Sequence, residues 1–359
     1  MLLHQFGWND FFESQLAGAP AGIPGRVASA NHGRFLVWTE ACEVDAGVSG
    51  VLRKSGALWP AVGDWAILRT DEAVIDRVLT RKTCVSRKQP EREIREQVLA
   101  ANVDVLFIVS GLDRNYNPRR IERFLVMANE SGARPVVLLN KADLAPPLKL
   151  DLAGIVASVQ QLSPAITVLP ISARPITGSS DHDLDALPAQ LAPGQTAALI
   201  GSSGVGKSTI LNRLLGDERQ RTTAVRASDS RGRHTTTTRQ LFRMPGGWLL
   251  MDLPGLREVQ LWSNMSNSEQ PRQNLEASFD DIQALAGSCR FRDCTHTAEP
   301  GCAVTAAALD PARLANFKKM QKELAHLERR TNPRLAKETR AKGNAIEKSV
   351  RQHPKRDSS

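Results

Sequence analysis

The sequence lacks long hydrophobic runs and is poor in cysteine and aromatic residues, with 5 cysteines and 5% aromatics in 359 residues. No apolar stretch approaches the roughly 18 residues that a membrane helix requires. The N-terminus lacks a basic segment and contains Asp10 and Glu13, so a secretory signal is not expected. These absences exclude a membrane protein, a collagen-like fibre and a small disulfide-bonded scaffold, and they favour a cytoplasmic location.

The residues that are present indicate a globular protein with a basic bias. Apolar residues make up 41% and charged residues 24%, and the length suggests two or three domains. The formal net charge is +9, and residues 318–359 contain 13 Lys and Arg against 5 Asp and Glu. This charge favours a polyanionic partner such as nucleic acid.

Residues 24–84 show the pattern of a small β domain. Apolar stretches such as Arg34–Trp38, Asp64–Leu68 and Ala73–Val78 alternate with turn-forming clusters. About five strands over roughly 60 residues suit an OB-like barrel, with some other small β domain as the alternative.

From about residue 100 to residue 260 the pattern predicts a doubly wound α/β sheet. Buried parallel strands are expected at Val103–Ser110, Pro135–Leu139, Thr167–Ile171, Ala197–Ile200 and Trp248–Met251. Helical patterns lie between them, as in Arg120–Ser131, which Gly132 ends. Ligands bind such sheets at the carboxyl ends of the strands, so the residues that follow each strand matter most.

A phosphate-binding loop follows the fourth of these strands. The motif G-x-x-x-x-G-K-[ST] comprises Gly201, Ser202, Ser203, Gly204, Val205, Gly206, Lys207 and Ser208, and Thr209 follows it as a further candidate for nucleotide binding. Strand, loop and helix occur in the required order, so backbone N–H groups are expected to surround the phosphates. Lys207 is expected to reach the β- and γ-phosphate oxygens, and the Ser208 hydroxyl to ligate Mg²⁺.

Two further strand ends carry motifs suited to guanine. They comprise Asn140, Lys141, Ala142 and Asp143 after one strand, and Ser172 and Ala173 after the next. The Asp143 carboxylate can accept hydrogen bonds from guanine N1 and N2, which adenine does not offer in that arrangement. A backbone N–H at Ala173 can reach guanine O6. The sequence therefore predicts GTP and GDP as ligands, and it argues against the rival hypothesis of a P-loop ATPase or kinase.

The order of the motifs predicts a circular permutation. Asp252-Leu-Pro-Gly255 follows the last strand, where Asp252 can hold Mg²⁺ through water and the Gly255 N–H can approach the γ-phosphate. An ordinary GTPase begins with the phosphate-binding loop, whereas here the guanine motifs precede it. The chain therefore leaves the γ-phosphate-sensing loop directly into the C-terminal region.

Three cysteines and a histidine crowd together near the C-terminus. Cys289, Cys294, His296 and Cys302 have the spacing C-x₄-C-x-H-x₅-C. Three thiolates and one imidazole form a closed tetrahedral set, which predicts one structural zinc ion, although thiolates also accept iron. Catalytic Cys–His chemistry is the alternative, but it lacks an orienting partner and leaves two cysteines unused.

These motifs together resemble the RsgA (YjeQ) family of circularly permuted GTPases that depend on the small ribosomal subunit. The resemblance covers nearly the whole chain and is most specific in Asp252–Glu258 and in Cys289–Cys302. It implies that the barrel is an OB-fold that binds ribosomal RNA, and that the protein acts late in small-subunit assembly. It also places a histidine proposed to act in hydrolysis at His234.

The expected catalytic apparatus is incomplete without a partner. Leu256 stands where many GTPases have a water-orienting glutamine, so basal hydrolysis should be slow. Residues 229–238 are the candidate switch I, from which Thr235 or Thr236 can complete the Mg²⁺ shell. His234 and Lys207 are the expected catalytic residues. A solvent-exposed or phosphate-facing role remains the alternative for His234.

The sequence thus predicts a four-part chain. The expected parts are an N-terminal extension and OB-fold at 1–85, a permuted GTPase at 90–262, a zinc-binding domain at 270–330 and a basic tail at 331–359. Apolar residues at helical spacing, Leu314, Phe317, Met320, Leu324 and Leu327, are expected to pack on the zinc module. The predicted function is GTP hydrolysis coupled to binding of the maturing small subunit, by a protein that is a monomer. The alternative is an RNA-binding scaffold that hydrolyses little GTP.

Overall fold

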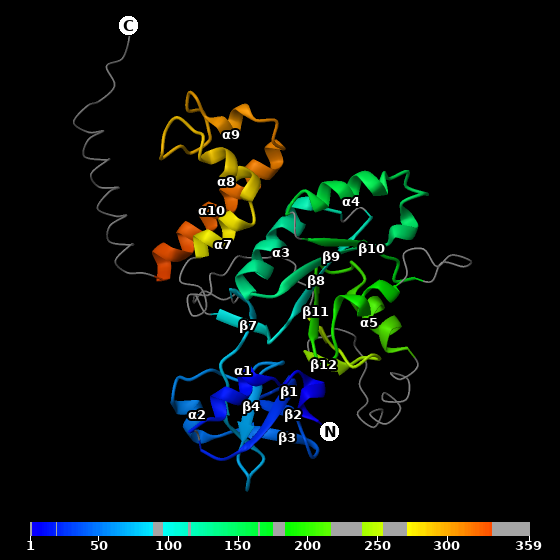
Figure 1. Cartoon of the computed structure of the whole chain (residues 1–359), viewed down its shortest axis with the longest axis vertical. Coiled ribbons are helices and arrows are strands. Elements are labelled where there is room, and N and C mark those ends of the chain that lie inside the picture. Colours follow the sequence, from blue (N-terminus) through cyan, green and yellow to red (C-terminus); the bar gives the residue numbers. More distant parts are fainter. Residues whose placement is uncertain are drawn as a thin grey trace, which may run out of the picture.

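The computed structural model describes residues 2–18, 20–88, 96–113, 116–163, 166–174, 184–216, 239–253 and 271–331. A barrel, a central α/β unit and a helical module follow one another along the long axis of the molecule (Figure 1). This arrangement confirms the predicted architecture. The predicted site residues His234, Thr235, Thr236 and Gly255, together with Leu256 and the tail after residue 331, lie outside the described residues.

The N-terminal part is a closed five-stranded barrel, as predicted. Its strands are β1 (Ile23–Asn31), β2 (Arg34–Thr39), β3 (Glu43–Val48), β4 (Trp65–Leu68) and β5 (Val74–Val78). Their order is β1-β2-β3-β5-β4, and β4 pairs with β1 to close the barrel. Only the β3–β5 pair is parallel. This strand order leaves no open edge within the barrel, which removes the risk of edge-to-edge association.

Short helices accompany the barrel strands and contribute buried side chains to their apolar core. They are η1 (Leu3–Phe6), α1 (Asp10–Glu13), η2 (Ser14–Leu16) and α2 (Gly50–Lys54). The rings of Trp8 and Trp65 meet edge to face, with centroids 4.7 Å apart, and Phe12 packs beside them. Such aromatic pairs add to the free energy gained from burial, so the N-terminal extension is an integral part of the barrel.

The central sheet contains all five strands that the sequence predicts. They are β8 (Val105–Gly111), β9 (Arg134–Asn140), β10 (Thr167–Pro170), β11 (Thr196–Gly201) and β13 (Leu249–Asp252). These strands are parallel in the order β10-β9-β8-β11-β13. Their carboxyl ends therefore meet along one edge of the sheet.

Three further strands, outside the barrel and the five predicted parallel strands, were not anticipated from the sequence. They are β6 (Cys84–Lys88), β7 (Glu96–Ala101) and β12 (Gln240–Arg243). β6 and β7 form a separate antiparallel pair. β12 runs antiparallel to β13 and also pairs with β1, because Gln240 lies opposite Ser29. The barrel is thus joined to the central sheet through β12.

A buried arginine also connects the barrel to the central sheet. Arg26 of β1 donates hydrogen bonds to the carbonyl oxygens of Phe6 (2.7 Å) and Asn102 (2.9 Å) and to Oγ1 of Thr196 (3.1 Å). Thr196 begins β11, the strand that leads into the phosphate-binding loop. The barrel therefore contacts the strand on which that loop is built.

Helices cover the sheet as the periodicity predicts. They are α3 (Pro118–Ser131), α4 (Leu152–Gln160) and α5 (Lys207–Leu215), with single turns η3 (Ala142–Leu144), η4 (Leu184–Ala186) and η5 (Pro188–Gln190). The Asn117 side chain caps α3 by accepting from the backbone N–H groups of Arg119 and Arg120. Pro118 occupies the first turn, and Gly132 ends the helix with φ 78°. The predicted stop at Gly132 is confirmed.

The C-terminal module is a small helical unit with its own apolar core. It contains α7 (Pro271–Ala277), α8 (Asp280–Ala286), α9 (Ala303–Ala306) and α10 (Pro311–Thr331). Four residues of the predicted stripe, Phe317, Met320, Leu324 and Leu327, are buried, and Leu314 is half-buried. Val126 of α3 belongs to the same cluster, so the module packs directly on the central unit.

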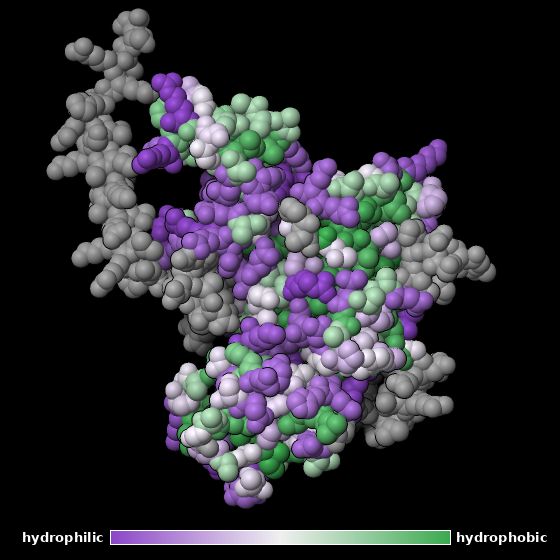
Figure 2. Space-filling view, in the orientation of Figure 1, coloured by the Kyte–Doolittle hydropathy of each residue, from purple (hydrophilic) through white to green (hydrophobic). Residues whose placement is uncertain are grey.

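Hydrophilic side chains gather where the module meets the central unit (Figure 2). No helix in the described part of the chain is long and apolar enough to cross a membrane.

One buried carboxyl group on α3 gives a prediction for stability. Oε1 of Glu130 is buried and has no hydrogen-bond partner among the described residues. Burial raises the pKa of Glu130 to about 8. The folded state therefore favours the protonated acid, so this group's contribution to stability is lost as pH rises from about 4.5 to about 8.

Glu130→Gln should remove this dependence. We expect the urea midpoint of the variant to exceed that of the wild type at pH 8, with the difference vanishing near pH 5. Glu72→Gln, which changes an exposed carboxylate on the barrel, is the control. An equal midpoint difference for Glu130→Gln at both pH values would contradict the explanation.

Candidate functional site

The four motifs predicted from the sequence converge at one edge of the sheet. β9 ends at Asn140, β11 ends at Gly201 and β13 ends at Asp252. Ser172 and Ala173 follow β10. These four strands are members of the same parallel array, so all the described motif residues lie at its carboxyl edge.

The phosphate-binding loop turns tightly between β11 and α5. At Gly206, φ is 102°, and a Cβ atom would lie 2.3 Å from Nδ2 of Asn140. A Cβ atom at Gly201 would lie 2.5 Å from the carbonyl oxygen of Val109. Any larger residue would clash at both positions, which explains the two glycines of the motif.

Lys207 lies inside this loop. Its Nζ donates to the carbonyl oxygens of Gly201 (2.9 Å) and Ser202 (3.0 Å). Burial lowers the pKa of Lys207, and the nearby Asp252 carboxylate partly offsets this effect. An ammonium group has three donors, so a third remains for a ligand. Ser208 and Thr209 are exposed in the first turn of α5.

Asn140 joins the guanine motifs to the phosphate-binding loop. Its Nδ2 donates to the carbonyl oxygen of Val205 at 2.7 Å, and its Oδ1 accepts from the backbone N–H of Ala173 at 3.0 Å. Lys141 adds a second connection, because its Nζ donates to the carbonyl oxygen of Gly204 at 3.0 Å. Lys141 has φ 66°, a left-handed conformation that turns the chain sharply after β9. Ala142 is buried beneath these groups.

Asp143 lies at the rim of a cavity of about 290 Å³. Its Oδ1 accepts a hydrogen bond from the Ser172 hydroxyl at 2.7 Å, which fixes the orientation of the carboxylate. The cavity is lined by Asn140, Lys141, Asp143, Leu144, Ala173, Arg174, Gly204, Gly206 and Thr209. A carboxylate held in such a cavity accepts hydrogen bonds and donates none, so it suits a ligand with adjacent N–H donors.

Some residues around this site were not predicted. Arg213 of α5 donates to the carbonyl oxygen of Ser172 at 2.8 Å, and Arg174 lines the cavity. Arg120 of α3 donates to Oγ of Ser202 at 3.1 Å. None belongs to a motif; each is identified only by its position in the fold.

The four predicted metal ligands meet at the far end of the helical module. One ligand atom from each of Cys289, Cys294, His296 and Cys302 lies within 4.8 Å of the others. Nδ1 of His296 lies 3.6 Å from Sγ of Cys289 and 3.5 Å from Sγ of Cys302. With metal–ligand bonds of about 2.0–2.3 Å, a tetrahedral site requires separations of this size. The cluster therefore fits a four-coordinate metal ion.

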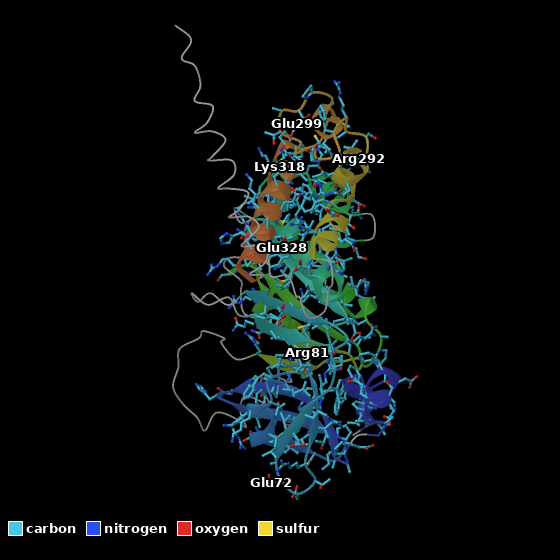
Figure 3. The ribbon with its side chains drawn as sticks, turned by 90° about the vertical axis from the view of Figure 1, so that its left-hand side faces the viewer. Glu72, Arg81, Arg292, Glu299, Lys318 and Glu328 are labelled. Carbon is cyan, nitrogen blue, oxygen red and sulfur yellow. The ribbon has the colours of Figure 1, made fainter. Side chains whose placement is uncertain are left out.

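Contacts outside the cluster hold its loops in place. The Glu299 carboxylate accepts from the backbone N–H groups of Thr295 (2.9 Å) and Thr297 (2.8 Å). Lys318 of α10 donates to the carbonyl oxygen of His296. Figure 3 labels Glu299 and Lys318 at the end of the molecule opposite the barrel. Lys318 thus connects the loop that carries His296 to the long helix α10.

Comparison with known families agrees with this geometry. The model of the RsgA GTPase family matches residues 78–262. A second model, described as 50S ribosome-binding GTPase, matches residues 196–332.

Named relatives cover nearly the full length of the chain. A small ribosomal subunit biogenesis GTPase RsgA from Opitutus terrae is 41% identical, over 96% of this chain and 96% of that protein. A protein of the same name from Methanosarcina acetivorans is 40% identical, over 89% of this chain and 84% of that protein.

Solved structures with a similar fold include YjeQ from Thermotoga maritima. Its TM-score is 0.57 at 25% identity, and the match covers 85% of this chain and 99% of that one. YloQ, described as a circularly permuted GTPase, has a TM-score of 0.56 at 22% identity, over 84% of this chain and 95% of that one. The second likeness concerns the fold alone, and it agrees with the permuted order of the motifs.

Proposed function

The chain belongs to the RsgA GTPase family, and from this premise we propose that it hydrolyses GTP in a cycle of binding to and leaving the maturing small ribosomal subunit. The observation that carries this proposal is the position of Asn140. One side chain connects the phosphate-binding loop at Val205 to the guanine motif at Ala173. A nucleotide that occupies both places would contact residues held together by this amide.

Each motif residue has a role in the proposed complex. Asp143 accepts hydrogen bonds from N1 and N2 of the guanine base, and the backbone around Ala173 contacts guanine O6. The loop from Gly201 to Thr209 surrounds the phosphates, with Lys207 supplying a positive charge. Ser208 and Asp252 would hold Mg²⁺, which supplies charge neutralisation at the phosphates. Outside the described residues, we assign Thr235 or Thr236 to the same metal ion and the Gly255 N–H to the γ-phosphate.

The proposed mechanism relies on electrostatics and positioning. Lys207 is buried and already directed into the loop, so its charge acts in a site with little competing water. We assign His234 to positioning of the attacking water, because Leu256 cannot do so. Lys207, held in the loop in this way, would stabilise charge that develops during phosphoryl transfer.

We further propose which parts contact which partners. The barrel is assigned to ribosomal RNA, and the basic tail at 331–359 to its phosphates. The proposed domain limits are 1–85, 90–262 and 270–330. We propose a cytoplasmic monomer.

A scaffold that hydrolyses little GTP is the second candidate, and Leu256 in place of a glutamine is the feature that favours it.

Association with the subunit tests this proposal. The full chain is sedimented with purified small subunits in the presence of a non-hydrolysable GTP analogue, GDP or no nucleotide. We expect pelleting with the GTP analogue and markedly less with GDP. Equal pelleting in all three conditions would contradict a nucleotide-controlled cycle and favour the scaffold.

We propose that the Cys₃His cluster holds one structural zinc ion. The module's apolar core packs against the cluster, because Cys289, Cys294 and Cys302 border it. Binding of a structural zinc ion supplies about 10–16 kcal/mol in isolated zinc-finger peptides, so its loss should unfold the module.

The expected result is one zinc ion per chain in the wild type and much less than one in Cys294→Ala. The variant should lose helical signal while GTP binding stays close to wild type. Cys42→Ala changes an exposed cysteine of the barrel and is the matched control. Freshly purified protein without metal, or with the three cysteines disulfide-bonded, would contradict this assignment.

A further inference from the structure

Helix α3 contacts two different parts of the protein through different faces. Arg119, Glu122, Arg123 and Val126 follow the spacing of one helical face and contact the C-terminal module. The next position, Arg120, instead contacts the phosphate-binding loop. The docking face of the module and the phosphate site therefore lie within one turn of the same helix.

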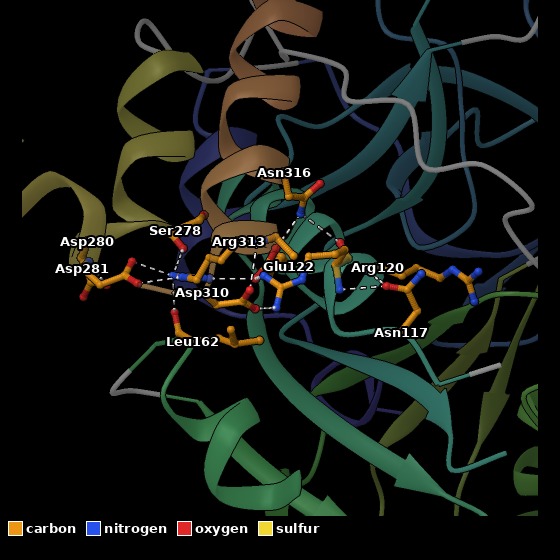
Figure 4. Close-up of polar contacts among 12 residues, drawn as sticks. Asn117, Arg120, Glu122, Leu162, Ser278, Asp280, Asp281, Asp310, Arg313 and Asn316 are labelled. Atoms are coloured by element: carbon orange, nitrogen blue, oxygen red, sulfur yellow. Dashed lines mark hydrogen bonds and ion pairs between the residues drawn. The ribbon is translucent and has the colours of Figure 1, made fainter. Parts of the chain in front are cut away.

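The module face of α3 is held by a buried ionic network (Figure 4). Glu122 is only 1% exposed and accepts from Nη1 of Arg313 at 3.1 Å and from Nδ2 of Asn316. Arg313 also donates to both carboxylate oxygens of Asp281, each at 2.7 Å. Glu122 is 1% exposed and Arg313 is 5% exposed, so the docking of α3, α8 and α10 places these two charges away from water. Within α3, Glu122 also pairs with Arg119.

Breaking a buried ionic network is costly, because any unpaired charge stays away from water. We therefore expect two states of the module, docked with the network complete or released with its charges solvated, and no stable partly docked arrangement. Such a two-state contact can be biased by a ligand that binds elsewhere on the same helix.

The other face of α3 holds the phosphate-binding loop. Nη1 of Arg120 donates to Oγ of Ser202 at 3.1 Å, and the carbonyl oxygen of Ser202 accepts from Lys207 at 3.0 Å. Ile121 and Phe124 border the same small cavity as Ser202. The second residue of the loop is thus held from α3 on one side and by the phosphate-binding lysine on the other.

We infer that Arg120 is a positioning residue for the phosphate-binding loop, through which α3 couples nucleotide binding to docking of the C-terminal module. A nucleotide that orders the loop strengthens the Ser202–Arg120 contact and fixes the first turn of α3. The fixed turn holds Arg119 and Glu122 in the geometry that the docked module requires. By thermodynamic linkage, docking must then raise nucleotide affinity by the same factor.

This inference rests on the proposed nucleotide site and concerns its regulation. Coupling between sites usually changes affinity by about 5- to 150-fold, and the short path along one helical turn leads us to expect about tenfold. The ionic network and the Arg120–Ser202 contact involve no residue of the guanine motifs. Both can therefore be altered without changing a guanine-binding residue.

The experiment measures hydrogen exchange of peptides from α10 in the full chain, with and without saturating GDP. In the wild type, GDP should slow exchange about tenfold. In Arg120→Ala, GDP at saturation should no longer change exchange, and Arg120→Lys should recover part of the effect. Arg134→Ala is the matched control. Arg134 is the first residue of β9 and donates to the carbonyl oxygen of Gln190, and neither residue belongs to α3 or the phosphate-binding loop.

The effect of module docking on nucleotide affinity is tested with Glu323→Gln, which weakens the ion pair between Arg123 and Glu323. This variant should lower GDP affinity several-fold in the wild-type background and leave it unchanged in the Arg120→Ala background. A purely structural role for Arg120 would alter exchange of α10 equally with and without GDP, which would overturn the inference.

The outcomes separate this inference from the proposed function. If GDP binds and α10 exchange is the same with and without it in the wild type, the coupling is wrong while the GTPase proposal stands. If Arg120→Ala keeps the full GDP effect, Arg120 is not the link. If no guanine nucleotide binds, both the coupling and the proposed function are overturned.

Discussion

Asp143→Asn will lose GTP affinity and gain affinity for xanthine nucleotides. The Asp143 carboxylate accepts from Ser172 through Oδ1 and faces the cavity in which we place the base. An asparagine amide donates where the carboxylate accepted, so the donors of guanine lose their partner and the additional carbonyl of xanthine gains one. Two lost charge-assisted hydrogen bonds, at about 1.5 kcal/mol or more each, correspond to roughly a 100-fold loss in GTP affinity.

Titration with fluorescent GTP, XTP and ATP analogues measures this change in nucleotide specificity. Asp151→Asn makes the same chemical change at the cap of α4, where an asparagine can still accept from Gly154, and should bind as the wild type does. Wild-type protein that binds ATP as tightly as GTP would contradict the role given to residues 140–143.

His234→Ala will abolish most of the hydrolysis stimulated by the small subunit and leave nucleotide affinity near wild type. The phosphate-binding loop follows β11 and Asp252 ends β13, and neither belongs to residues 229–238, so we expect binding and hydrolysis to be separable. Removal of a general acid–base or water-positioning group typically costs about 100- to 10,000-fold in rate. Single-turnover phosphate release with saturating subunits measures this loss.

Lys207→Ala serves as the contrast, because it should lose nucleotide binding as well as hydrolysis. Its ammonium group lies within the loop and carries the charge that the phosphates meet. Full stimulated activity in His234→Ala would move the role to another residue or to the ribosome. The GTPase assignment would stand, and the mechanism would be wrong.

The repeating structure of the central sheet was predictable because its strands are buried on both faces. Continuous apolar runs such as Val103–Ser110 have few alternative structures when helical patterns lie between them. The phosphate-binding loop was equally clear, since glycine at Gly201 and Gly206 is required by close contacts. Local sequence therefore determined which elements form and where the ligand-binding edge lies.

Contacts between distant segments could not be predicted in the same way. β12 is four residues long and is defined by two partners: β13, which follows it closely in the chain, and β1, which lies near the N-terminus. From the sequence alone, Glu122 is a polar residue on an amphipathic helix. In the structure it is buried against Arg313 and Asn316, which lie more than 190 positions later in the chain. The Arg120–Ser202 contact spans 82 positions and belongs to no motif. Such pairs depend on tertiary packing, which a single sequence does not encode locally.

Phosphate release from GTP and from ATP, with and without purified small ribosomal subunits, tests the central claim most directly. The account predicts slow release from GTP by the isolated chain, a large increase when small subunits are added, and no release from ATP in either condition. Equal turnover of ATP and GTP, or a GTPase rate that small subunits leave unchanged, would contradict it.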